Sequence, residues 1–180
     1  MLQVVDAVAS LREGGYDVGF MLVGEEGGLD AVHKRCAFHG ITEHCAFVGT
    51  VPYADVPGYV RAMDVGTIPF KRGNPISERS LPLKLFEYAA CGVPVISSPL
   101  PGVVDVASEE VLFADDAAAF ARQVRTLIED PEGRAERGAA SRELAESFSW
   151  SAQVDAIEQE LATLAGVDLA DDELEAEGEA

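Results

Sequence analysis

The sequence predicts an α/β fold: a Rossmann-like, doubly wound and mostly parallel sheet with helices on both faces. Short apolar runs alternate with helical patterns, the turns between them are short, and a hydrophobic content of 48% over 180 residues suits one globular domain. Regular strand–helix alternation is typical of a parallel sheet buried on both faces. Ligands of such sheets bind beyond the carboxyl ends of the strands, so we search after Gly24, Gly49, Pro69 and Ser98.

The elements are expected in a simple order. An amphipathic helix over 1–13 ends at Gly14 and Gly15, since glycine disfavours helix continuation. Later helices open at Asp116 and at Asp130, which is followed by Pro131. The expected strands span 18–23, 46–48, 65–69, 93–97 and 111–113, and the other expected helices span 28–39, 56–62, 82–91, 116–128, 131–146 and 149–164.

The order begins with a helix, whereas a doubly wound domain normally opens with a strand at the middle of its sheet. We therefore expect a sheet that lacks its first strand. Gene truncation, a misplaced start codon or a split gene would each produce such a chain. An edge helix that precedes a complete sheet is the alternative.

Charge limits the partners of the chain. A formal net charge of −19 argues against nucleic acid or an anionic membrane. Only three of the thirteen basic residues are lysines, Lys34, Lys71 and Lys84. Many carboxylates with few lysines favour the acidic proteome of a halophile, with an ordinary acidic mesophile as the alternative. Residues 168–180 carry seven acids and no base, so 166–180 is expected to be a disordered acidic tail.

Cysteine usage and hydropathy favour a cytoplasmic protein. Cys36, Cys45 and Cys91 are odd in number and form no CxxC pair, which favours small buried side chains in a reducing compartment. The three histidines within 33–44 have no metal-ligand spacing. No apolar run is long enough to span a bilayer, and the N-terminus lacks the basic start of a secretory signal.

The most informative segment is 80–94, SLPLKLFEYAACGVP. It predicts a helix that begins beside Pro82 and stops at Gly92, with Lys84 and Glu87 on one face. A helix N-terminus attracts phosphate, and Lys84 adds a full positive charge there. Glu87 lies about 4.5 Å further along the axis, which suits a nucleotide with phosphate at one end and sugar hydroxyls at the other. A solvent-exposed Lys84–Glu87 ion pair is the alternative.

Three motifs in register extend this prediction. FVGTVPYADVPGYVRAMDVGTIPF (47–70) precedes PLKLFEYAACGVPVISSPLPGVVDV (82–106), and FSW (148–150) follows. Together they resemble the nucleotide-sugar-binding half of GT-B glycosyltransferases, specifically the retaining family 4-type (group 1) enzymes. The resemblance implies that 1–165 is the C-terminal domain of such an enzyme and lacks its first strand. In relatives the last helix crosses back to the N-terminal domain, so without that domain its apolar face would be exposed.

The resemblance also implies roles for single residues. Glu87 would bind the ribose hydroxyls. Lys84 and the backbone of Leu83, on the helix that begins beside Pro82, would meet the diphosphate. Gly49, Thr50 and Val51 would lie along the base. Arg79 occupies the position where relatives carry the acid that holds the donor sugar, so the neighbouring Glu78 is the candidate for that role.

The expected activity is transfer of a hexose from a nucleotide-diphosphate-sugar to an unknown acceptor, with retention and without a metal or other cofactor. The isolated chain is expected to be weak or inactive. The alternative is a non-catalytic nucleotide-binding remnant or a partner subunit that acts with a separate N-terminal GT-B domain. A sugar-nucleotide epimerase is less favoured, because no His or Glu general base stands in a ligand-facing loop.

Overall fold

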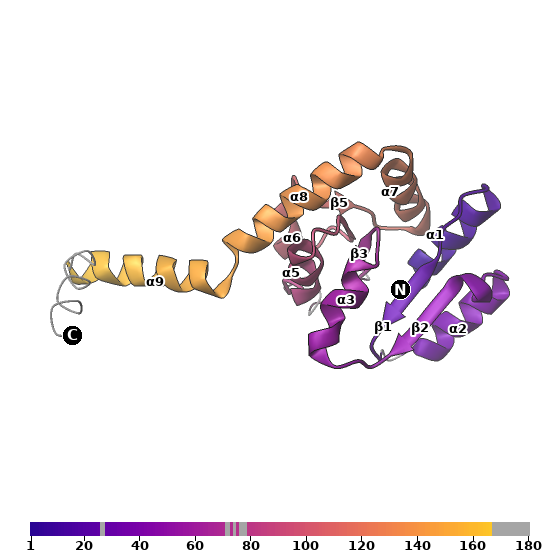
Figure 1. The fold of residues 1–180 in the computed structure, drawn as a ribbon, viewed down its shortest axis with the longest axis horizontal. Coiled ribbons are helices and arrows are strands. Elements are labelled where there is room, and N and C mark those ends of the chain that lie inside the picture. The colour runs from indigo at the N-terminus through magenta and orange to yellow at the C-terminus, as the bar shows by residue number, and fades with distance from the viewer. Residues whose placement is uncertain (26–27, 71–72, 74, 76–78, 167–180) are drawn as a thin grey trace.

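A computed structural model describes residues 1–25, 28–70, 73, 75 and 79–166 (Figure 1). Strands and helices alternate along the chain as the sequence predicts. In chain order the elements are α1 Leu2–Glu13, β1 Phe20–Val23, α2 Leu29–Phe38, η1 Thr42–His44, β2 Cys45–Gly49, η2 Tyr53–Asp55, α3 Val56–Arg61, β3 Gly66–Ile68, α5 Leu83–Ala90, β4 Val95–Ser97, α6 Pro101–Ala107, β5 Leu112–Phe113, α7 Ala117–Glu129, α8 Pro131–Ser147 and α9 Trp150–Ala165.

The strand pairs are parallel, as predicted. β1 pairs with β2, and β3, β4 and β5 form a second sheet in that order. Among the described residues no ladder joins β1 to β3, so the strands do not form one continuous sheet.

Helices cover both faces of the strands. On one face α1 packs against α2 and α7, and the buried cluster there includes Val5, Phe20 and Ile96. On the other face α5 packs against α8, β3 and β4 over a second cluster that includes Leu85 and Val95. Val95 and Ile96 are neighbours in β4, and neighbours in a strand point to opposite faces. The doubly covered arrangement is confirmed.

One helix was not expected. The segment after β4 forms α6, with Leu100 as its N-cap and Pro101 in its first turn. Pro101-Gly102 indicates a turn as readily as a helix start, so the sequence alone does not predict this helix. Proline suits the first turn because its missing N–H would have no partner inside the helix.

Helix α9 extends away from the rest of the molecule (Figure 1). Trp150, its first residue, is 88% exposed, and Leu164 near its end is 79% exposed. Exposed apolar side chains recur every three or four residues and form one stripe along the helix, which we call the α9 stripe: Trp150, Val154, Ile157, Leu161 and Leu164. The expected exposed apolar face is confirmed. Within the described residues no helix is both long and apolar enough to cross a membrane.

Candidate functional site

A cavity of about 370 Å³ opens at the carboxyl ends of the strands, and we call it the strand-end cavity. The segments after β1, β2 and β3 reach it through Gly24 and Glu25, through Thr50 and Val51, and through Pro69 and Phe70. Three of the four segments expected from the parallel topology therefore meet at one place. The fourth, after Ser98, leads into α6, and Ser98 is absent from the lining residues described.

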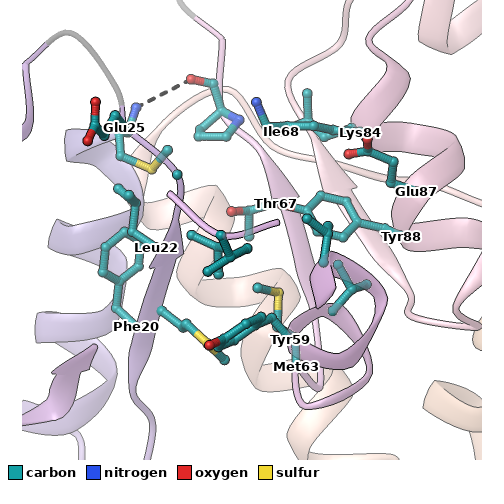
Figure 2. Close-up of a pocket in the computed structure, with 18 of the residues that line it drawn as sticks. Phe20, Leu22, Glu25, Tyr59, Met63, Thr67, Ile68, Lys84, Glu87 and Tyr88 are labelled. Carbon is teal, nitrogen blue, oxygen red and sulfur yellow. Dashed lines mark hydrogen bonds between the residues drawn. The ribbon is translucent and has the colours of Figure 1, made fainter. Parts of the chain in front are cut away.

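Helix α5 brings Lys84 and Glu87 to this cavity (Figure 2). The helix is fixed by Leu85 and Ala89, both fully buried, which leaves Lys84 and Glu87 on the side that faces the cavity. Its N-cap is Pro82, in an extended conformation with φ −68° and ψ 127°. A proline side chain has no oxygen that could cap the helix, so no side chain caps the N–H groups of Leu83 and Lys84. The Leu85 N–H donates to the Pro82 carbonyl at 3.0 Å.

The charged side chains of the cavity stand on two walls. Lys84 is the only basic side chain among the described lining residues, and it shares α5 with the Glu87 carboxylate. Figure 2 places Glu25 on the opposite side, beside β1. No ion pair joins Lys84 to Glu87 within the described structure, so the exposed ion-pair alternative is wrong. Both side chains are therefore available for a ligand.

The other predicted residues lie near this cavity to different degrees. Thr50 and Val51 line it, whereas Gly49 makes the turn before them with φ +76°. The Gly49 carbonyl accepts a hydrogen bond from the Gly24 N–H at 2.7 Å, which joins the ends of β1 and β2. Leu83 is 76% exposed and stands outside the lining. Arg79 is exposed and does not line the cavity, and Glu78 lies outside the described residues.

Several lining residues were not expected as site residues. Glu25 follows β1 directly, and Tyr53, 79% exposed, follows Val51 by two residues. Both residues follow the carboxyl end of a strand, where ligands of parallel sheets bind, and this position is the sequence signal that could have identified them. Tyr88 of α5 also lines the cavity. Burial, and to a smaller extent the Glu87 carboxylate, raises the pKa of Tyr88.

Comparisons with known proteins identify the family. The model of the family "Glycosyl transferases group 1" matches residues 1–130. A GDP-mannose-dependent α-(1-6)-phosphatidylinositol monomannoside mannosyltransferase of Mycolicibacterium smegmatis is 28% identical over 153 residues, which are 82% of this chain and 40% of the relative. A related monoacylated-substrate mannosyltransferase of Corynebacterium glutamicum is 30% identical over 139 residues, 74% of this chain and 36% of that protein. The chain thus spans less than half the length of these relatives.

Solved structures share the fold. Anabaena HepE, crystallised with UDP and glucose, matches with a TM-score of 0.70 at 22% identity, over 92% of this chain and 44% of its own. The pneumococcal O-GlcNAc transferase GtfA, crystallised with UDP and GlcNAc, matches with a TM-score of 0.72 at 16% identity, over 91% of this chain and 33% of its own. Because the family model matches residues 1–130, which is most of this chain, the chain belongs to the group 1 glycosyltransferases, and it has the fold of a GT-B domain.

Proposed function

We propose that the chain is the donor-binding domain of a retaining glycosyltransferase and holds a nucleotide-diphosphate-sugar in the strand-end cavity. The observation that carries the proposal is that one cavity is lined by Lys84 and Glu87 of α5 and by Thr50 and Val51 after β2. Relatives that use GDP-mannose and structural neighbours crystallised with UDP support a nucleotide-linked donor.

The diphosphate would lie at the N-terminus of α5. First-turn N–H groups and the Lys84 ammonium favour negative charge there. Glu87, one helical turn along, would accept hydrogen bonds from the ribose hydroxyls. The base would lie along Thr50 and Val51, where the exposed Tyr53 ring offers a flat apolar surface for stacking.

The proposed site would act on the negative charge that develops on the diphosphate during glycosyl transfer. In glycosyl transfer the bond between the anomeric carbon and the diphosphate oxygen breaks, and the electron pair leaves with the diphosphate. Fixed N–H dipoles and Lys84 would stabilise that charge without reorganising at the moment of reaction. Such a site needs no metal ion, and retention of configuration is what the family resemblance implies.

We also propose that the chain needs a second domain for activity. The α9 stripe exposes five large apolar side chains, which is typical of a surface that another protein part covers. The relatives are more than twice as long as the matched region. The same stripe is compatible with a subunit of a split enzyme, and a separate chain carrying an N-terminal GT-B domain that restores sugar transfer would identify that case.

Calorimetric titration of the chain with UDP, GDP and ADP in high salt tests donor binding. We expect one of the three to bind measurably better than the others. Absence of binding by all three would contradict the proposal. A separate assay with UDP-glucose and GDP-mannose tests incompleteness, because measurable sugar transfer by the chain alone would show that no second domain is required.

A further inference from the structure

Glu25 is the only charged side chain that the described part of β1 and its following turn contribute to the strand-end cavity. It is exposed, and no basic side chain pairs with it in the part of the chain that the structure describes. Lys84 and Glu87 stand on the opposite wall (Figure 2). The proposed donor site gives roles to Lys84 and Glu87 and leaves the Glu25 carboxylate without one.

The backbone at Gly24 fixes where Glu25 leaves the sheet. The Gly24 N–H donates to the Gly49 carbonyl at 2.7 Å, and a φ of +105° at Gly24 turns the chain directly before Glu25. A positive φ of this size is one that glycine adopts readily and other residues do not. Thr50 and Val51 follow Gly49 and line the same cavity. Glu25 therefore leaves the sheet beside the segment along which we place the base.

Charge decides which part of a nucleotide-sugar Glu25 can face. A carboxylate repels a diphosphate, and in the proposed site the diphosphate lies at Lys84, on the other wall. The ribose lies at Glu87, on the same helix as Lys84. The donor sugar is bonded to the diphosphate and so lies at the end of the ligand away from the base. The base is therefore the part that reaches the β1 and β2 side of the cavity.

The rest of this side offers apolar surface and no further charge. Every other lining residue that the structure describes after β2 and in α3 is uncharged: Thr50, Val51, Tyr53, Val56, Tyr59, Val60 and Met63. Aromatic rings stack on any base, because every base has a π face. Stacking on Tyr53 would therefore hold a base without distinguishing one from another. Discrimination between bases requires hydrogen bonds to their edges, which Glu25 can supply.

The chemistry of a carboxylate indicates which base edge it prefers. An ionised carboxylate has two acceptor oxygens and no donor, so it fits two donors that lie side by side. Guanine presents its N1–H next to its 2-amino group. Uracil presents one N–H between two carbonyl acceptors, and adenine presents one amino group beside an acceptor nitrogen. Guanine alone would give the carboxylate two charge-assisted bonds, whereas the other two bases would oppose an acceptor to an acceptor.

We propose that Glu25 recognises the base of the donor and makes the strand-end cavity selective for a guanine nucleotide. One carboxylate oxygen accepts from the guanine N1–H, and the other accepts from the 2-amino group. Glu25 is thus a residue that determines specificity and takes no part in bond breaking. The inference rests on the proposed donor site and adds the identity of the base.

Calorimetric titration with four nucleoside diphosphates tests this inference: GDP, UDP, ADP and inosine diphosphate. Inosine diphosphate has the guanine edge without the 2-amino group, so it keeps one of the two bonds. The proteins are the parent chain, Glu25→Gln and Glu109→Gln. Glutamine keeps the size of the side chain but replaces one acceptor with a donor. Glu109 is exposed in the turn after α6 and does not line the cavity, so its variant is the control for lost charge.

We expect the parent to bind GDP at least about tenfold more tightly than UDP or ADP, with inosine diphosphate between them. Glu25→Gln should bind GDP at least about tenfold more weakly than the parent does and should not weaken UDP binding, and Glu109→Gln should match the parent.

Three outcomes would overturn the role of Glu25 and leave the donor site in place. These are a parent that prefers UDP or ADP, a GDP preference that survives in Glu25→Gln, and equal binding of GDP and inosine diphosphate by the parent. Absence of binding by all four nucleotides would instead overturn both the role of Glu25 and the proposed donor site.

Discussion

The ring of Tyr88 lies directly against the backbone of Gly66, so closely that a Cβ atom at position 66 would stand 2.5 Å from Tyr88 Cγ. Gly66 opens β3 and Tyr88 lies in α5. The contact therefore sets how close α5 comes to β3. Since Lys84 and Glu87 belong to the same helix, it also sets where they stand in the strand-end cavity.

Replacing Gly66 with alanine should destabilise the fold. The added methyl group meets the base of the ring rather than the flexible end of a side chain, so α5 or β3 must shift. Overpacking of this kind costs about 1–3 kcal/mol of unfolding free energy. Urea unfolding measures the loss, and nucleotide titration should show weaker binding in the same variant.

Gly58→Ala is the matched control. Gly58 lies inside α3, and a Cβ there meets nothing within 4 Å. Alanine in a helix interior is favoured by about 0.5–1 kcal/mol over glycine, so this variant should be as stable as the parent or slightly more. Equal stability of the Gly66 and Gly58 variants would show that Tyr88 does not fix α5.

A pH-dependent ion pair joins α1 to α2. Both Asp6 carboxylate oxygens accept from Arg35, Oδ1 from Nε at 2.5 Å and Oδ2 from a terminal nitrogen at 2.8 Å, and His39 Nε2 lies 2.8 Å from Oδ1. The hydrogen bond with Arg35 is the main cause that lowers the pKa of Asp6 below 3.8. A carboxyl with a lowered folded-state pKa stabilises the fold above its unfolded pKa, and this stabilisation is lost as pH falls through the folded value.

Asp6→Asn should therefore lower the free energy of unfolding by about 1 kcal/mol at pH 7, a modest amount because the ion pair is partly exposed. Since the parent's carboxylate becomes protonated in acid, the difference in unfolding free energy between variant and parent should shrink toward pH 2. Urea unfolding at both pH values measures it. Asp17→Asn is the control, since Asp17 pairs with Arg12 through a fully exposed side chain. A stability difference for Asp6→Asn that did not depend on pH would show that the carboxylate charge is irrelevant.

The thiol of Cys45 should be unreactive in the folded chain. Burial, followed by a hydrogen bond with Cys36, raises the pKa of Cys45 to about 12. Only the thiolate reacts with iodoacetamide, so alkylation should stay slow from pH 7 to 9 and rise toward pH 12. Peptide mass spectrometry measures the labelling, with urea-unfolded protein as the reference. Rapid labelling of folded Cys45 at pH 8 would contradict its placement.

The α9 stripe should make the isolated chain self-associate or bind hydrophobic dyes. The double variant Ile157→Ser, Leu161→Ser removes the centre of the stripe and should lower both self-association and dye binding. Because these side chains are already exposed, the free energy of unfolding should change by less than about 0.5 kcal/mol. Gln159→Ser, between them in sequence and on another side of α9, should change neither. Size-exclusion chromatography at several concentrations and dye fluorescence report the result. An unchanged double variant would remove the reason to expect a covering domain.

Most elements were predictable from local sequence, because their ends depend on residue type. Asp116, Asp130 and Ser149 each accept a hydrogen bond from a backbone N–H three residues on, at 2.7, 2.9 and 3.2 Å, and so cap α7, α8 and α9. Strand ends were less predictable. The runs 18–23 and 93–97 begin two residues before the ladders of β1 and β4, because apolar character marks burial while a ladder also needs a neighbour.

The site was predictable in part for a similar reason. Lys84 and Glu87 were identified from their spacing on one helix, which depends on local geometry alone. The places of Glu25 and Tyr53 in the cavity depend on which strands lie side by side, and local sequence does not specify that arrangement.

The most direct test of donor binding is calorimetric titration of three proteins with the nucleoside diphosphate that binds best. These are the parent chain, Lys84→Ala, and Lys34→Ala, which removes an equal charge from the exposed surface of α2. A charged hydrogen bond is worth about 1.5–3 kcal/mol, so Lys84→Ala should bind at least about tenfold more weakly with its fold intact, and Lys34→Ala should bind as the parent does. Equal affinity of the parent and Lys84→Ala would contradict the assignment of the diphosphate to α5.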